Sequence, residues 1–218
     1  MSAPTGFPAV ADIVFRDLAV DAEAYESCSE MLTVPERRRA DRYPFPADRR
    51  RFIVGRGLLR AELARRIGGS PQAVPIVEGP VGKPMLADRS QPWFSASRSG
   101  ELAAFAFSPS PVGIDLVRVR DAGFLPGVAR EICSPRELAA LDLLAPSHRA
   151  SALAILWARK EALLKATGEG LVRMPDWVDV WDGSGSIEIR VTHRGRTWSI
   201  ADVPAPPGYI VAVARACD

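Results

Sequence analysis

The spacing of hydrophobic residues predicts which segments of this chain are helical. In the segment that contains Phe52, Leu59 and Leu63, apolar residues recur every three or four positions, a spacing that places them on one face of an α-helix. Several such segments begin at an aspartate or a serine, the residue types that cap helix N-termini. We therefore expect helices over residues 21–31, 48–66, 134–144 and 146–167.

The last of these helices carries two opposite charges beside its apolar face. Its leucines cluster on one face, whereas Trp157, Glu161 and Lys165 follow one another at intervals of four residues and share a neighbouring stripe. The helix ends at Gly168. A carboxylate and an ammonium group thus point the same way from the edge of a buried helix. On helix statistics alone, they would form a surface ion pair worth about 0.3–0.5 kcal/mol.

Short extended segments make up most of the remaining chain. Some runs are continuously apolar, as in buried strands, and the C-terminal region alternates apolar and polar residues. We expect strands over residues 9–18, 74–77, 93–97, 102–107 and 112–117, and then around Val178 and Val180 and over residues 187–191, 198–200 and 209–213. Glycine and proline residues between Arg118 and Arg130 indicate a loop.

The order of these elements suggests that the chain consists of two similar halves. Each half has a long helix followed by several short strands, and Pro109 and Pro111 mark a boundary near residue 110. We predict an N-terminal half over residues 1–110 and a C-terminal half over residues 111–218. The fold class is α+β, in which helices pack on largely antiparallel sheets.

The composition is that of a globular protein. The 218 residues are 47% hydrophobic and 25% charged, with a net charge of +2, which is small for a dedicated nucleic-acid-binding protein. Arginines between residues 37 and 66 leave nucleic-acid binding as an alternative, although acidic residues are interspersed among them. No apolar run reaches the ~18 residues of a membrane helix, and we find no secretory signal. Three cysteines without a CxxC pair fit a reducing cytoplasm, our predicted location.

The scarcity of lysine and histidine narrows the chemistry. Only three of the 28 basic residues are lysines, namely Lys83, Lys160 and Lys165, and we take them to mark positions that need a compact ammonium group. The two histidines, His148 and His193, lie near no nucleophile motif. A general base would therefore be a carboxylate, and a metal would be an oxygen-liganded cation such as Mg²⁺.

Asp115 is unusual because it interrupts the apolar run over residues 112–117. An ionised carboxylate is costly to bury unless it is paired or bound to a metal. The alternative is a strand end at which the carboxylate faces solvent. Together with Glu161, Asp115 suggests a magnesium site with two carboxylates.

Several motifs resemble, in order and spacing, those of the 4′-phosphopantetheinyl transferases. Gly113-Ile114-Asp115 is followed by residues 157–165, with the sequence WARKEALLK. Residues 82–84 (GKP) and 94–100 (FSASRSG) resemble motifs of the family's N-terminal half, and residues 35–38 and 55–60 resemble its basic opening. The resemblance spans most of the chain and is closest to the monomeric, surfactin-synthetase-activator type.

This resemblance implies a specific activity and architecture. Members of the family transfer the 4′-phosphopantetheine arm of coenzyme A to a serine of an apo carrier protein, in a Mg²⁺-dependent reaction that releases adenosine 3′,5′-bisphosphate. Their fold is a pseudo-dimer of two α+β halves, each with helices packed on a small antiparallel sheet, and coenzyme A binds in the cleft between the halves. We therefore expect a monomer. Fatty-acid, polyketide and nonribosomal-peptide carriers all remain open as partners.

The resemblance also implies roles for individual residues. Asp115 and Glu161 would hold Mg²⁺ against the diphosphate of coenzyme A. Glu161 would also deprotonate the attacking serine, and Lys165 would stabilise the leaving phosphate. The coenzyme A pocket would contain Arg37, Arg51, Lys83, Ser97, Arg98, Lys160 and Lys165.

The loop after Asp115 is expected to contact the carrier protein. Arg118 and Arg120 would meet acidic residues of the carrier, and Phe124 and Leu125 would supply an apolar anchor. The alternative is an ordinary solvated loop.

Two positions depart from the family pattern. Val117 stands where many members have a second acid, so that a water could replace one metal ligand. Arg98 stands where a histidine is usual, and an arginine can clamp phosphate but cannot perform a task that needs a titratable imidazole. A degenerate homologue that binds coenzyme A without efficient transfer is therefore an alternative function.

Overall fold

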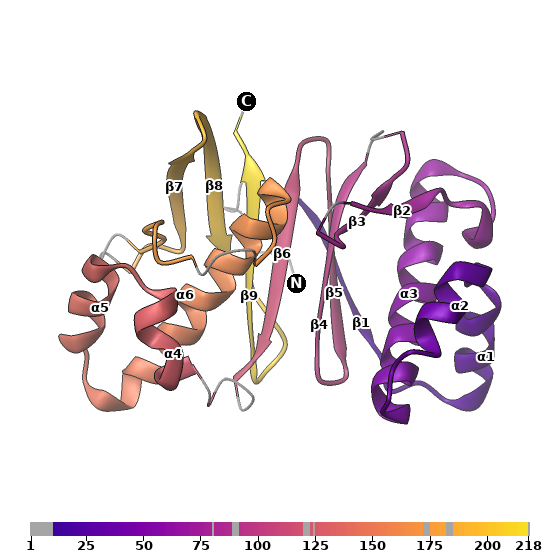
Figure 1. Cartoon of the computed structure of the whole chain (residues 1–218), viewed down its shortest axis with the longest axis horizontal. Coiled ribbons are helices and arrows are strands. Elements are labelled where there is room, and N and C mark those ends of the chain that lie inside the picture. Colours follow the sequence, from indigo (N-terminus) through magenta and orange to yellow (C-terminus); the bar gives the residue numbers. More distant parts are fainter. Residues whose placement is uncertain are drawn as a thin grey trace, which may run out of the picture.

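The chain uses nearly the same order of elements twice (Figure 1). In each half a strand comes first, three α-helices follow, and antiparallel strands complete the half. The third helix is 22 residues long in both halves. The structure, a computed structural model, describes residues 11–217 except 80, 89–91, 120–122, 124, 172–174 and 182–184. The repeated order agrees with the duplication that we expected from the sequence.

The N-terminal half contains a three-stranded sheet and a short hairpin, with its helices at one end of the molecule (Figure 1). In chain order, its elements are β1 (Asp12–Asp17), α1 (Ala22–Glu30), α2 (Val34–Ala40), α3 (Pro46–Ile67), a 3₁₀ turn (Pro71–Ala73), β2 (Ile76–Glu78), β3 (Pro84–Leu86), β4 (Trp93–Ser99) and β5 (Leu102–Ser108). The predicted boundary at residue 110 falls in the connection that follows β5.

The C-terminal half contains a four-stranded sheet. Its elements are β6 (Val112–Arg118), α4 (Leu125–Ile132), α5 (Pro135–Asp142), α6 (Pro146–Thr167), β7 (Glu188–His193), β8 (Arg196–Asp202) and β9 (Tyr209–Ala216). Among the described residues of both halves, no helix is both long and apolar enough to cross a membrane.

The two main sheets share a strand order that confirms the predicted α+β fold class. The order is β1-β5-β4 in the N-terminal half and β6-β9-β8-β7 in the C-terminal half, so the first strand of each half pairs with the last. All of these pairs are antiparallel. Asp12 lies opposite Phe107 in one sheet and Val112 lies opposite Arg215 in the other.

A shared apolar layer joins the two sheets. Ala104 and Ala106 of β5 pack with Ile114 of β6 and with Val211 and Val213 of β9, and all five residues are buried. Burial of this layer fixes β4 beside β6, which brings edge strands of the two sheets together. Figure 1 shows the two strands at the centre of the molecule.

Helix α6 lies directly against β6 at Gly113. A Cβ atom on Gly113 would lie 2.0 Å from the carbonyl oxygen of Ala162, so only glycine allows this close approach. The resulting contact sets the distance between Asp115, which follows on the strand, and the charged stripe of the helix.

Two of our secondary-structure predictions are wrong. Residues around Val178 and Val180 form no strand, because side chains satisfy their backbone: Lys160 donates to the carbonyl of Val178, and Arg159 to that of Val180. The predicted loop between Arg118 and Arg130 contains most of α4. Pro126 is tolerated there because it lies in the first turn of the helix, where its missing N–H needs no partner.

Candidate active site between the halves

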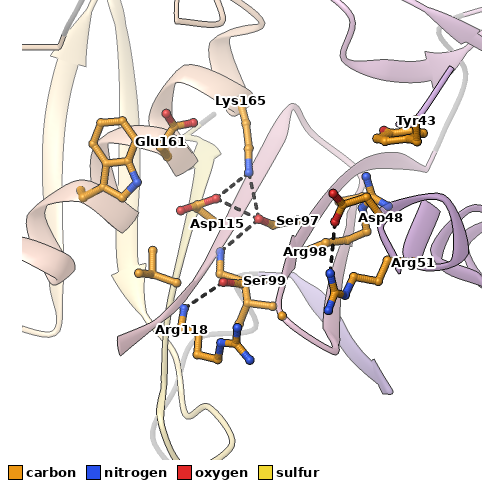
Figure 2. Close-up of a pocket in the computed structure, with 15 residues that line it drawn as sticks. Tyr43, Asp48, Arg51, Ser97, Arg98, Ser99, Asp115, Arg118, Glu161 and Lys165 are labelled. Atoms are coloured by element: carbon orange, nitrogen blue, oxygen red, sulfur yellow. Dashed lines mark hydrogen bonds and ion pairs between the residues drawn. The ribbon is translucent and has the colours of Figure 1, made fainter. Parts of the chain in front are cut away.

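A cavity of about 590 Å³ lies where β4 and β6 meet, and α6 and the start of α3 complete its walls (Figure 2). Both halves of the chain contribute to its lining. The lining residues are Tyr43, Asp48, Arg51, Ala96, Ser97, Arg98, Ser99, Gly100, Asp115, Leu116, Val117, Arg118, Trp157, Glu161 and Lys165. The stripe of Trp157, Glu161 and Lys165 therefore faces a cavity and does not form an ordinary helix surface.

Asp115 is held by two hydrogen-bond donors in this cavity (Figure 2). Its Oδ1 atom accepts from Lys165 Nζ at 2.6 Å and from the Ser97 hydroxyl at 2.9 Å. Lys165 Nζ also donates to the Ser97 hydroxyl at 3.0 Å. Asp115 is only 6% exposed, and its ion pair with Lys165 offsets part of the cost of burying the carboxylate. The three groups form a fixed polar triangle that joins β4, β6 and α6.

Glu161 carries an unsatisfied oxygen beside this triangle. Its Oε1 atom is buried and has no hydrogen-bond partner. Burial, and then the nearby charge of Asp115, raise the pKa of Glu161 to about 7, although Lys165 acts in the opposite direction. A carboxylate with a buried, unpartnered oxygen next to a second carboxylate is suited to a small divalent cation. The two side chains therefore fit Mg²⁺.

Protein ligands for such a cation are few. Within the described ranges, no group of three or more His, Cys, Asp or Glu side chains is arranged to hold a metal. Val117, where a further acid was expected from the family pattern, lines the cavity with an apolar side chain. The remaining ligands of a cation bound here would be water or substrate oxygens, which is usual for Mg²⁺.

The raised pKa of Glu161 predicts a pH-dependent stability for the metal-free protein. The folded state holds the proton up to about pH 7, whereas an ordinary glutamate loses it near 4.5. This contribution to stability is therefore complete below pH 4.5 and lost as the pH rises through 7, at a cost of roughly 3 kcal/mol. Glu161→Gln should thus melt higher than the wild type at pH 8 in EDTA, and the difference should vanish near pH 5.

Thermal unfolding at both pH values measures this effect. Glu131, an exposed residue of α4, supplies the matched control, because Glu131→Gln removes a carboxylate outside the cavity. If the melting temperatures of Glu161→Gln and the wild type differ by the same amount at pH 5 and pH 8, the raised pKa of Glu161 is contradicted.

Four of the seven predicted coenzyme A residues line the cavity, namely Arg51, Ser97, Arg98 and Lys165. Arg98 is exposed, and its guanidinium lies 5.6 Å from the centre of the Phe52 ring. Arg51 donates to Glu101 at 2.8 Å and to Asp48 at 3.1 Å. Arg51 is therefore already paired with carboxylates, whereas Arg98 presents its charge to the cavity.

The structure places two other predicted coenzyme A residues outside this cavity. Arg37 is exposed on α2 and donates to the carbonyl of Leu32. Lys83 Nζ donates to two backbone carbonyls, those of Val112 at 2.9 Å and Lys165 at 2.6 Å. Burial, followed by repulsion from Lys165, lowers the pKa of Lys83 to about 8.

The prediction that Lys160 lies in the coenzyme A pocket is wrong. Its side chain is 0% exposed, and Nζ forms an ion pair with Glu137 at 2.8 Å. The same nitrogen donates to the carbonyls of Pro175 and Val178 at 2.7 and 2.6 Å. These three partners use all three hydrogens of the ammonium group, so Lys160 cannot also bind a phosphate. Lys160 instead links α6 to α5 and to the segment over residues 175–178.

Of the predicted carrier-contact residues, Arg118 lines the cavity and packs over Gly100. Arg120 and Phe124 lie outside the described residues, as does the side chain of Leu125.

Several lining residues were not predicted from the sequence, among them Ser99, Tyr43 and Asp48. Ser99 could have been found because it stands two residues after Ser97, and alternate residues of a strand face one side. Tyr43 and Asp48 had no comparable signal, since they reach the cavity only through the packing of α3 against the rest of the N-terminal half.

Comparisons with known proteins converge on one family. The family model described as the 4′-phosphopantetheinyl transferase superfamily matches residues 111–214. The 4′-phosphopantetheinyl transferase HetI of Nostoc is 33% identical over 85% of this chain and 78% of its own length. The 4′-phosphopantetheinyl transferase Sfp of Bacillus subtilis is 26% identical over 93% of this chain and 90% of its own length. The Synechocystis protein slr0495 is 35% identical over 65% of this chain and 58% of its own length.

Proposed function

Because the chain belongs to the 4′-phosphopantetheinyl transferase superfamily, we propose that it transfers the 4′-phosphopantetheine arm of coenzyme A to a serine of an apo carrier protein. The reaction depends on Mg²⁺ and releases adenosine 3′,5′-bisphosphate. The observation that carries this proposal is the convergence of Asp115, Glu161 and Lys165 on one cavity between the halves.

The proposed step is a phosphoryl-type transfer. The serine oxygen of the carrier attacks the phosphorus atom that bears pantetheine, and the bond from that phosphorus to the bridging oxygen of the diphosphate breaks. The bridging oxygen and the electron pair of this bond leave with adenosine 3′,5′-bisphosphate, and the serine proton passes to Glu161. Lys165 neutralises charge on the leaving phosphate. Mg²⁺, when held by Asp115 and Glu161, supplies further neutralisation of the diphosphate oxygens.

The cations of the cavity support binding of a phosphate-rich substrate. Arg98 offers a permanent charge at the cavity wall. We propose that it contacts a phosphate of coenzyme A in place of the histidine usual at this position. Ser97 would act indirectly, through the carboxylate of Asp115.

Nucleic-acid binding finds no support in the arrangement of the arginines. Several guanidinium groups of α2 and α3 are paired with neighbouring acids and are therefore not free to contact a phosphate backbone. The pairs are Arg39–Glu78, Arg49–Asp41, Arg51–Glu101, Arg56–Glu36 and Arg65–Glu62.

We also propose that the enzyme works as a monomer in the cytoplasm. One chain supplies both walls of the cavity, so a second copy is not needed to complete it. Cys28, Cys133 and Cys217 are free thiols, which suits a reducing compartment.

The activity can be tested by intact mass spectrometry of a carrier protein. The protein is incubated with an apo carrier, Mg²⁺ and coenzyme A. We expect the carrier to gain the mass of one phosphopantetheine arm, and a carrier whose target serine is changed to alanine should gain none. An unmodified carrier together with tight coenzyme A binding would identify a degenerate homologue instead.

Val117→Glu should tighten the metal site. Val117 lines the cavity, so a carboxylate there would add an oxygen ligand beside Asp115 and lower the Mg²⁺ concentration for half-maximal activity by roughly tenfold. Mg²⁺ titration of the initial rate measures this. Val119→Glu is the control, because Val119 is exposed and does not line the cavity. A weaker or unaltered Mg²⁺ dependence of Val117→Glu would contradict the proposed ligand geometry.

Arg118→Glu should weaken recognition of the carrier. Reversing a charge at the cavity rim should raise the carrier KM roughly tenfold while the KM for coenzyme A stays within about twofold. Arg136→Glu is a matched control, because that side chain is 89% exposed on α5. An unchanged carrier KM would remove Arg118 from the carrier interface.

A further inference from the structure

Side chains of the N-terminal half form hydrogen bonds with the backbone along one edge of β6. On its opposite edge, β6 pairs with β9 through the backbone. On the edge that faces β4, the backbone N–H groups of Ile114, Leu116 and Arg118 donate to three serine hydroxyls. These bonds join Ile114 to Ser95 at 3.1 Å, Leu116 to Ser97 at 3.2 Å and Arg118 to Ser99 at 3.0 Å.

Lys83 extends this series by one position. Its ammonium group donates to the carbonyl of Val112, the first residue of β6. Four alternate residues of one strand edge thus bind side chains of the N-terminal half. We call Lys83, Ser95, Ser97 and Ser99 the seam ladder.

The seam ladder fixes the register between the two halves. Each serine lies 19 residues before the N–H that it accepts, so all three bonds specify the same alignment of β4 and β6. Ser95 and Ser97 are almost fully buried, where an unpaired N–H would cost free energy. A one-residue slip of β4 along β6 would break all three serine bonds together. The ladder therefore performs the task that backbone pairing performs within a sheet.

Lys83 connects the same seam to the end of α6. Besides Val112, it donates to the carbonyl of Lys165 at 2.6 Å, one of the last carbonyls of the helix, which have no partner within it. The side chain of Lys165 in turn binds Asp115 and Ser97. Lys83 thus holds the backbone of the residue whose ammonium group enters the active cavity.

We propose that the seam ladder positions the active site across the two halves, and that Lys83 is a positioning residue for Lys165 and not a ligand of a coenzyme A phosphate. The kinetic consequences of this inference rest on the proposed function. The alignment of the two halves by the seam ladder does not depend on it. The side chains of Ser95 and Lys83 form hydrogen bonds with the backbone of β6 and α6. They therefore act on Asp115 and Lys165 through these two elements.

Hydrogen exchange tests the ladder without any assay of activity. Ser95→Ala should speed exchange at the Ile114 amide, and Ser99→Ala at the Arg118 amide, by roughly fivefold to tenfold. Ser199→Ala is the matched control, because Ser199 is a buried serine of β8 whose hydroxyl donates to Glu188. It should leave both amides of β6 unchanged. Unaltered exchange at Ile114 and Arg118 in the serine variants would overturn the ladder.

Steady-state kinetics test the role of Lys83. A misplaced Lys165 should lower kcat of Lys83→Met by about 10–100-fold while the KM for coenzyme A stays within about threefold. Lys83→Arg, which keeps cationic donors near the two carbonyls, should recover part of kcat. A phosphate ligand would behave in the opposite way, with a raised KM for coenzyme A and an unchanged kcat.

The outcomes separate the two proposals. An increased KM alone, or no change in either constant, would overturn the positioning role of Lys83. A wild-type protein that transfers nothing would remove the proposed function, and hydrogen exchange would still decide the ladder. Circular dichroism shows whether Lys83→Met folds, and if it does not, Ser95→Ala should show the same loss of kcat with a constant KM.

Discussion

Glu161→Ala should lower kcat for carrier modification by three or more orders of magnitude. The variant loses a predicted general base, worth about 10²–10⁴-fold, and one of the two carboxylates that we assign to the metal. The Oε1 atom of Glu161 is buried without a hydrogen-bond partner and lies beside a second carboxylate, which supports a cation as its partner. Initial rates at saturating coenzyme A and carrier measure the effect.

Two comparisons make this result specific. Glu131→Ala removes an exposed glutamate of α4 and should leave kcat unchanged. Glu161→Gln keeps an oxygen ligand but cannot accept a proton, so it should retain more Mg²⁺ affinity than Glu161→Ala and still lose most of the turnover. Wild-type-like turnover of Glu161→Ala would remove this residue from both roles.

Asp115→Ala should cause a loss of similar size, for a different reason. The substitution removes a predicted metal ligand and also the carboxylate that accepts from the ammonium group of Lys165 and from the hydroxyl of Ser97. We expect kcat to fall by three or more orders of magnitude. Titration with Mg²⁺ should show a higher half-maximal concentration for the residual activity.

Asp115→Asn distinguishes the charge from the hydrogen bonds. Asparagine can still accept from Ser97, so the fold of the seam should persist while the metal site weakens. Asp142→Ala is the control, because that side chain is 82% exposed near the end of α5. Full activity of Asp115→Asn with an unaltered Mg²⁺ dependence would contradict a role for this carboxylate in metal binding.

Local patterns in the sequence singled out three charged residues that the structure brings into one cavity. Glu161 and Lys165 share a helix stripe with Trp157, and Asp115 interrupts an apolar strand, so each position is marked by its immediate neighbours. The same reasoning should have excluded Lys160. It stands four residues after Leu156 and three before Leu163, on the apolar face of the helix, and its burial follows from that spacing.

Contacts between the halves could not be read from the sequence. Lys83 lies in a turn-rich segment, and nothing near it indicates that its ammonium group binds Val112 and Lys165. The alternation around Val178 looked like a strand, because no local rule reveals that buried side chains of α6 satisfy its backbone. Tertiary packing decides such positions.

The central claim is that this cavity couples carrier modification to cleavage of coenzyme A in the presence of Mg²⁺. Quantifying both products of one reaction, by mass spectrometry for the carrier and by chromatography for adenosine 3′,5′-bisphosphate, tests it most directly. The account predicts equal molar amounts of the two products with Mg²⁺ and neither product in EDTA. Modification that persists in EDTA, or bisphosphate released without any modified carrier, would contradict it.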